Sequence, residues 1–286
     1  MKFSFLRPII LTSLLFSIFL IATPAAGTEY FDNLKSEIKA RQYSEQEALN
    51  IGIYTLPSKY RANNNLSKFK AYEADVDNDG AAELVVFRFT PDANEPCLQD
   101  FCNLTIYKKT DLKYTIFKII NVDDQVSGNM SYDFRLTDLD RNGIPELFFH
   151  GDSVGTLGYG DVTVYQWNGS DFSVARLHGD PMVSPEDIAG DDGTVMIKQS
   201  YMKNSLDGYP SGATIVYWPD IYKYENYKFV RSNVSFPDYY RKLSLESREV
   251  IKSIKKRTAD KLTLEYKNYF LAMHSQIIRR CQKYIK

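Results

Sequence analysis

The sequence has few of the residues that most often carry out catalysis or bind transition metals. Three histidines and three cysteines occur among 286 residues. His150, His178 and His274 are too far apart in the chain to match the ligand spacing of a zinc site. No glycine-rich loop of the phosphate-binding type opens a helical pattern. These absences leave little in the sequence that indicates an enzyme.

A long apolar run is also missing. The apolar stretch at residues 9–22 is shorter than the about 20 residues that a membrane-spanning helix needs. Lys2 and Arg7 precede it and small residues at 23–27 follow it, which is typical of a cleavable signal peptide at residues 1–27. An uncleaved anchor is the alternative. No cysteine follows the stretch, so we expect no lipid attachment and a secreted or periplasmic protein.

Two of the three cysteines lie close together. Cys97 and Cys102 fall in a loop between two predicted strands, and in an oxidising compartment we expect them to form a disulfide. The loop that they would close is small, so the bond would hold a loop tip rather than the fold. We interpret Cys281 as a half-buried helix residue, in preference to an intermolecular bridge.

What the sequence does contain is two acidic loops of one pattern, 63 positions apart. The first is DVDNDGAAELVV, beginning at Asp75, and the second is DLDRNGIPELFF, beginning at Asp138. Positions 1, 3, 5 and 9 carry oxygen-bearing side chains and position 6 is glycine in both. Several oxygens in one tight turn, with glycine at the sharp bend, are what a hard cation such as Ca²⁺ requires.

These loops do not match an EF-hand. An EF-hand needs a bidentate Glu at position 12 and a helix on each side. Position 12 is Val86 in the first loop and Phe149 in the second, and the flanking residues alternate as strands do. We therefore expect a cation loop that connects two strands.

A loop of this pattern between strands resembles the Ca²⁺ loop of integrin-type FG-GAP and VCBS β-propeller repeats. In that family the side chains at positions 1, 3, 5 and 9 and the carbonyl at position 7 hold the ion. The resemblance implies two Ca²⁺ sites, formed by Asp75, Asp77, Asp79, the Ala81 carbonyl and Glu83, and by Asp138, Asp140, Asn142, the Ile144 carbonyl and Glu146. It also implies a binding or structural role toward a protein or glycan ligand. Acidic turns that hold no ion are the alternative.

Between residues 68 and 231 the apolar period is two, which indicates strands. Hairpins are predicted at 104–120, 162–176 and 221–231. The first two follow an acidic loop, so one unit comprises a strand, the loop, a strand, a long loop and a hairpin. The third unit has no oxygen-rich loop at 187–196, and we assign it no ion.

Three units are too few to close a propeller, which uses about 4–8 blades. We therefore predict a mainly β fold of blade-like antiparallel repeats, arranged as a partial propeller or a sandwich-like body, with α-helices at both ends. The helices would cover exposed sheet edges and faces.

The N-terminal segment, residues 28–56, is predicted to be helical. Leu34 and Ile38 share one helical face, and Ser44 with Glu47 forms the capping-box pattern of a second short helix that would run through Ile53.

The C-terminal segment, residues 241–286, is predicted to be basic, amphipathic and helical. It carries 13 basic and 4 acidic residues, against 20 and 32 in residues 28–240. Its apolar stripe advances by three or four positions and comprises Tyr266, Phe270, Met273, Ile277, Cys281 and Tyr284. We expect the stripe to dock on the β body. Membrane contact through an exposed stripe is the alternative, and we expect no nucleic-acid partner.

One short motif could suggest a hydrolase. Residues 151–155 match G-x-S-x-G around Ser153, but a nucleophile elbow needs a helix after the serine, and four glycines at 151–160 disfavour one. We therefore predict a non-enzymatic protein. The alternatives are an extracellular hydrolase that uses Ca²⁺ structurally, and a membrane- or polyanion-binding factor that acts through its basic C-terminal helix.

Overall fold

The computed structural model describes residues 34–53, 68–89, 103–111, 113–121, 130–153, 160–179, 181–188, 193–202, 216–256 and 261–285. They all belong to one unit, residues 34–286. The predicted signal peptide at 1–27 and the predicted Cys97–Cys102 disulfide lie outside the described residues.

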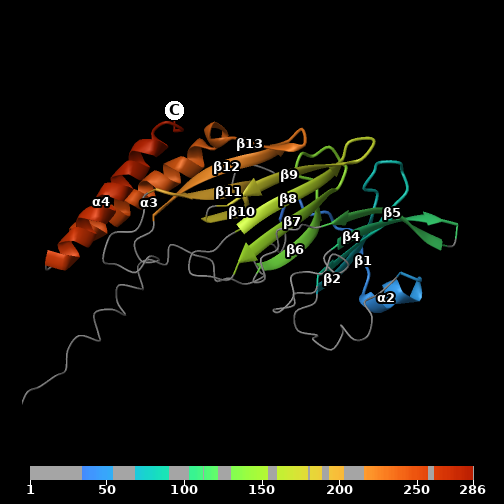
Figure 1. The fold of residues 1–286 in the computed structure, drawn as a ribbon. Coiled ribbons are helices and arrows are strands. Elements are labelled where there is room, and N and C mark those ends of the chain that lie inside the picture. The colour runs from blue at the N-terminus through green and yellow to red at the C-terminus, as the bar shows by residue number, and fades with distance from the viewer. Residues whose placement is uncertain are drawn as a thin grey trace, which may run out of the picture. The chain divides into compact units, whose positions relative to one another are not determined.

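The fold is mainly β, as predicted, and consists of three antiparallel sheets whose strands follow one another in chain order (Figure 1). The first sheet contains β1 (Arg41–Gln42), β2 (Lys68–Ala74), β3 (Glu83–Phe89), β4 (Asn103–Thr110) and β5 (Lys113–Asn121). The second contains β6 (Met130–Thr137), β7 (Glu146–Ser153), β8 (Gly160–Trp167) and β9 (Phe172–His178). The third contains β10 (Pro181–Asp187), β11 (Thr194–Tyr201), β12 (Tyr217–Glu225) and β13 (Lys228–Arg231). Among the described strands, no sheet closes into a barrel.

The three predicted hairpins are confirmed as β4–β5, β8–β9 and β12–β13. Their turns use residues that tolerate a positive φ. Asn226 and Tyr227, with φ of 51° and 61°, form a two-residue turn whose twist suits a right-twisted hairpin. Gly169, with φ of 96°, lies in the turn between β8 and β9. The pattern of strand, loop, strand and hairpin therefore recurs three times.

The second sheet is buried on both faces. Phe149 on β7 lies 5.5 Å from Phe87 of β3 and 4.8 Å from Phe134 of β6 between ring centroids. Its neighbour Phe148 instead joins a cluster that includes Val183 of β10. Successive side chains on a strand point to opposite faces. One face of the second sheet therefore packs on the first sheet, and the other packs on the third.

The prediction of helix at the N-terminal end is wrong for residues 34–42. Ile38 donates its backbone N–H to the Leu136 carbonyl at 3.0 Å, Glu37 bridges to Thr137, and β1 pairs with β2. Backbone groups that bond to other strands cannot also form the i to i−4 bonds of a helix. We call residues 34–42 the N-terminal strap.

The short helix after the strap is confirmed as α2 (Glu45–Asn50). Ser44 accepts from the Glu47 backbone N–H and Glu47 accepts from that of Ser44, which completes the predicted capping box. The helix ends at Asn50, three residues earlier than predicted, and Gly52 with φ of 81° follows.

The C-terminal region forms α3 (Pro237–Lys255) and α4 (Lys261–Cys281), which follow the 3-10 turn η4 (Asn233–Ser235). The apolar stripe of α4 is buried against α3 and the third sheet, in a cluster with Trp218, Ile221 and Tyr240. Tyr240 stacks on Trp218 at 5.5 Å and donates its hydroxyl hydrogen to the Pro219 carbonyl at 3.1 Å. The expected docking of the stripe on the β body is therefore confirmed.

Cys281 belongs to that stripe and is fully buried rather than half-buried. Its thiol is free, and burial raises its pKa to about 11. Within the part of the chain that the structure describes, no helix has both the length and the apolarity needed to cross a membrane.

Candidate metal centres

The two acidic loops have the same backbone conformation. Asn78 and Arg141, at position 4, have φ of 58° and 60°, and Gly80 and Gly143, at position 6, have φ of 88° and 82°. Left-handed backbone is easiest for glycine, so the predicted bend at position 6 is confirmed. Each loop joins two paired strands, β2 to β3 and β6 to β7.

Side chains within each loop bond to its own backbone. In the first loop Asp75 accepts from the N–H groups of Asp79 at 3.2 Å and Gly80 at 2.9 Å. In the second, Asp138 accepts from Gly143 at 3.3 Å. Such bonds are typical of Asp in turns and form whether or not an ion is bound. These bonds hold each loop in one conformation, and they do not identify a ligand.

The position-5 and position-7 residues also interact within each loop. Ala81 donates its N–H to Asp79 at 2.9 Å, and Ile144 donates to Asn142 at 2.7 Å. The ligand role of the Ala81 and Ile144 carbonyls stays a prediction.

The position-9 glutamates point inward from the first residue of β3 and of β7. Glu83 is 1% exposed and Glu146 is 0% exposed. Each accepts from the backbone N–H at position 2, which is Val76 at 2.9 Å and Leu139 at 2.6 Å. These glutamates complete two clusters whose carboxylate oxygens lie within 4.8 Å of one another: Asp75, Asp77 and Glu83, and Asp138, Asp140 and Glu146.

The first loop contains an ammonium group that the sequence analysis did not foresee. Lys108 extends from β4, and its Nζ lies 2.5 Å from Asp77 Oδ2, 2.5 Å from Asp79 Oδ2 and 3.8 Å from Glu83 Oε1. Nζ also lies 4.6 Å from the centroid of the Phe117 ring, within cation–π range. Hydrogen bonds to the two aspartates raise the pKa of Lys108, which keeps it charged.

The second loop has a neutral amide in the corresponding place. Gln166 extends from β8 and donates from Nε2 to Glu146 Oε1 at 2.6 Å and to Asp140 Oδ2 at 3.0 Å. The Tyr224 hydroxyl donates to Gln166 Oε1 at 3.2 Å. No Lys or Arg of the described residues forms an ion pair with Asp138, Asp140 or Glu146.

The second cluster therefore carries charge that has no cation partner among the described residues. Asp138 Oδ1 is buried and accepts no hydrogen bond, as is also true of Asp77 Oδ1 in the first loop, whose other oxygen meets Lys108. Burial, with smaller contributions from Asp140 and Asp138, raises the pKa of Glu146 to about 9. Burial raises the pKa of Glu83 to about 7, and the Val76 N–H and, less strongly, Lys108 oppose that rise. A buried oxygen without a partner is costly, and a bound cation would satisfy it.

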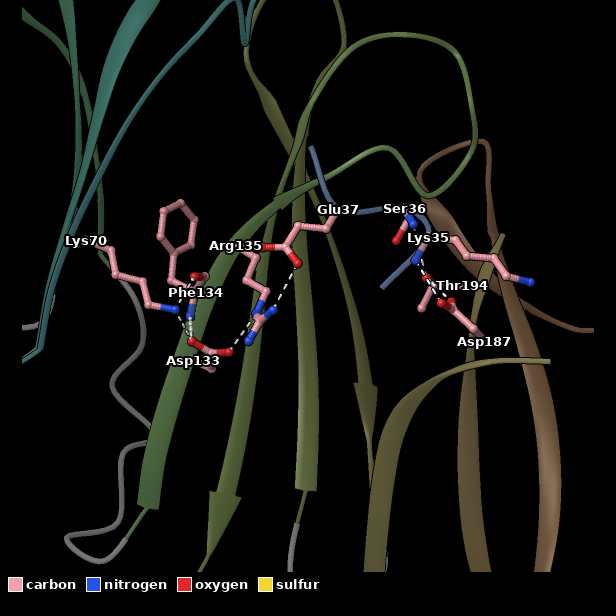
Figure 2. Close-up of polar contacts among 9 residues, drawn as sticks. All are labelled: Lys35, Ser36, Glu37, Lys70, Asp133, Phe134, Arg135, Asp187 and Thr194. Atoms are coloured by element: carbon pink, nitrogen blue, oxygen red, sulfur yellow. Dashed lines mark hydrogen bonds and ion pairs between the residues drawn. The ribbon is translucent and has the colours of Figure 1, made fainter. Parts of the chain in front are cut away.

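The third unit has no such cluster among its described residues. Thr194 pairs with Asp187 as Glu146 pairs with Thr137, so a threonine stands where the glutamate would be. Figure 2 shows that Lys35 N–H donates to Asp187 at 2.8 Å, while Ser36 N–H contacts Thr194 Oγ1 at 3.4 Å. In this unit, backbone N–H groups of the strap thus donate hydrogen bonds to Asp187 and Thr194.

The strap also links the other two sheets. Figure 2 shows a row of charges in which Lys70 of β2 pairs with Asp133 of β6, and Arg135 joins Asp133 at 2.8 Å to Glu37 at 3.1 Å. Burial alone would raise the pKa of Asp133, but these cations lower it overall. The strap carbonyl of Ser36 accepts from the N–H of Asp138 at 2.8 Å, which holds the first residue of the second loop.

The structure describes the hydrolase motif only as far as the backbone of Ser153. Ser153 is the last residue of β7 and pairs with Met130, and β8 begins at Gly160, so the described backbone places Ser153 on a paired strand. The histidines have other partners, which are the Val183 carbonyl for His150, Asp161 for His178 and Ser247 for His274.

Comparison with protein-family models found no matching family, and comparison with curated proteins and with solved structures found no match. The likeness to FG-GAP and VCBS repeats therefore rests on the residues of the two loops and on the strands that carry them.

Proposed function

We propose that this chain is a secreted or periplasmic Ca²⁺-binding β-repeat protein, similar to FG-GAP and VCBS modules, with a binding or structural role and no enzymatic activity. The observation that carries this proposal is the second loop. Three carboxylates converge there, one buried oxygen has no partner, and no described ammonium or guanidinium neutralises the cluster.

Calcium suits these donors better than softer metals do. Ca²⁺ takes 6–8 oxygen ligands in flexible geometry. Asp138, Asp140, Asn142, the Ile144 carbonyl and Glu146 supply oxygens from one turn, and water completes the shell. No cysteine or histidine belongs to either cluster, and those ligands would be expected for zinc.

The ion would act mainly on stability. It would replace the proton on the buried Glu146 and join the loop to the start of β7. It would bind only the folded chain, which shifts the unfolding equilibrium by mass action. Because the Asp138 backbone is held by the strap, the ion would also strengthen the join between strap and second sheet. A rigid set of β units is a suitable support for a protein or glycan ligand.

The burial of the α4 stripe supports a binding or structural role over the membrane alternative. An interfacial helix needs a free apolar face, whereas Phe270, Met273 and Ile277 pack in the cluster with Trp218. Arg280 of α4 lies over the Trp218 ring, and the attraction of the exposed Arg279 to anions is screened by salt.

Calorimetric titration of metal-stripped protein tests the proposal. Ca²⁺ should bind with a dissociation constant near 10⁻⁴–10⁻³ M, which is typical of extracellular modules, and should raise the melting temperature. Mg²⁺, which is smaller and loses its water reluctantly, should bind more weakly. Absence of both binding heat and thermal stabilisation at several millimolar Ca²⁺ would overturn it.

A further inference from the structure

We propose that the Lys108 ammonium is the resident cation of the first loop, so that the protein binds a single Ca²⁺, at the second loop. The residue at the strand position that Lys108 occupies on β4 determines whether a loop binds an ion. This inference rests on the proposed function and narrows the two predicted sites to one.

Lys108 and Gln166 occupy equivalent positions in the two units. Leu84 pairs with Tyr107, which places Lys108 opposite Glu83 in the antiparallel register. Leu147 pairs with Tyr165, which places Gln166 opposite Glu146 in the same way. Both side chains contact the position-3 aspartate and the position-9 glutamate of their loop. At this strand position the two units therefore differ in one side chain, which is a cation in the first unit and a neutral amide in the second.

The Lys108 ammonium meets the groups that would hold the ion. It contacts the position-3, position-5 and position-9 carboxylates, which are Asp77, Asp79 and Glu83. An ammonium carries three donors and no acceptor, so it cannot act as a ligand. A divalent cation at the same oxygens would be repelled by it at close range, where solvent screens poorly. Ca²⁺ can enter only if Lys108 leaves.

Contacts around Lys108 oppose its leaving. Its side chain is only 28% exposed, and the ammonium lies over the Phe117 ring. Withdrawal would break three ion pairs and the ring contact together, and would leave Asp77, which is 8% exposed, without its cation. Lys108 thus offsets part of the negative charge of the first loop, and Ca²⁺ would have to displace it to bind.

Gln166 has the opposite properties. It is neutral, so it does not repel a cation, and its amide carries an oxygen as well as an NH₂ group. It is 1% exposed and is anchored by Tyr224 from the third sheet. In the second loop no described ammonium group therefore competes with an incoming cation, and Asp138 Oδ1, like Asp77 Oδ1 of the first loop, is without a hydrogen-bond partner.

Exchanging the two residues tests the inference. Equilibrium dialysis with radioactive Ca²⁺ should count one ion on the wild-type protein, two on Lys108→Gln, none on Gln166→Lys, and one on the double exchange. Lys109→Gln removes the neighbouring exposed charge and is the matched control, so it should still bind one ion. In the wild-type background, Asp138→Asn should abolish binding and Asp75→Asn should not.

The outcomes separate this inference from the proposed function. Two ions on the wild-type protein, or one ion on Lys108→Gln, would overturn the role of Lys108 and leave calcium binding intact. If neither the wild-type protein nor Lys108→Gln binds an ion, the proposed function itself is overturned. Circular dichroism melts confirm that each variant folds, and Lys108→Met is a second neutral variant, which should also bind two ions.

Discussion

The first and second acidic loops share their backbone conformation, their glycine, their buried glutamate and their cluster of carboxylates, yet they differ in how their charge is compensated. In the first loop the partner is Lys108. In the second loop it is the neutral Gln166. Each loop also keeps one buried carboxylate oxygen without a hydrogen-bond partner, Asp77 Oδ1 in the first and Asp138 Oδ1 in the second. The comparison teaches that the loop alone does not define the ion site. A residue on the neighbouring strand contributes as much as the loop does.

The same difference appears in the protonation of the two glutamates. Both are buried, and both accept a backbone N–H from position 2. The pKa of Glu83 is raised to about 7 and that of Glu146 to about 9, chiefly by burial. A backbone N–H lowers both values and neighbouring aspartates raise both, but among the described residues only Glu83 has a nearby cation, Lys108, that lowers its pKa further. Without an ion, the second loop is therefore the one that retains a proton at neutral pH.

The largest expected effect concerns how the free energy of unfolding depends on pH when a chelator has removed Ca²⁺. Each glutamate holds its proton more tightly folded than unfolded, so stability falls as pH rises from about 4.5, up to about 7 for Glu83 and about 9 for Glu146. At 1.36 kcal/mol per pKa unit, the upper limit for Glu146 is about 6 kcal/mol. Urea unfolding from pH 5 to pH 10 measures it.

Two variants assign this pH dependence. Glu146→Gln should flatten the fall between pH 7 and pH 9, and Glu83→Gln should change only the part below pH 7. Saturating Ca²⁺ should remove the contribution of Glu146 to the pH dependence of stability, because the ion keeps that carboxylate ionised. A wild-type profile that is level above pH 7 in chelator would contradict the assignment.

A second test compares Asp138→Ala with Asp75→Ala. With free Ca²⁺ at a hundred times its dissociation constant, the ion adds about 2.7 kcal/mol to the free energy of unfolding. Asp138→Ala should lose that amount when Ca²⁺ is present, in addition to a smaller loss in chelator from its bond to the Gly143 N–H. Asp75→Ala removes bonds to Asp79 and Gly80 N–H, so it should lose about 1 kcal/mol with or without Ca²⁺. Equal Ca²⁺-dependent losses in the two variants would show that both loops bind.

The smallest expected effect concerns the support of Gln166. Tyr224→Phe removes the hydroxyl that donates to Gln166 Oε1, which should cost about 1 kcal/mol of stability and weaken Ca²⁺ binding a few-fold. Tyr222→Phe, two residues away on the same strand, is the control. Calorimetry on both variants measures the difference, and equal Ca²⁺ affinities would mean that Tyr224 does not orient the amide.

Much of this architecture could be predicted from the sequence. Alternating residues and turn signals predicted the hairpins, because both depend on near neighbours in the chain. The acidic loops were predictable for the same reason. Lys108 and Gln166 were not, because their place beside Glu83 and Glu146 follows from strand register and not from any local pattern. The third unit was predicted to lack an ion, but that the strap bonds to Asp187 and Thr194 could not be foreseen.

The strap shows where sequence periodicity misleads. Leu34 and Ile38 are four apart, as on a helix, and both are shielded from solvent. Their spacing also fits an irregular segment that packs apolar side chains between sheets. What decides the outcome is the set of bonds to Leu136, Asp187 and Thr194, which lie about a hundred or more residues further along the chain. Such long-range partners override a local helical preference.

The same strap limits the order in which the protein can fold. A chain made from its N-terminus presents residues 34–38 long before Asp187 and Thr194, which are 152 and 158 residues away from their strap partners. Contacts of such sequence separation form late, because closing a long loop costs entropy before any bond repays it. The strap must therefore close after the third sheet has formed. Closure of the strap also holds the backbone of Asp138. We therefore expect the second loop to reach its final conformation late in folding.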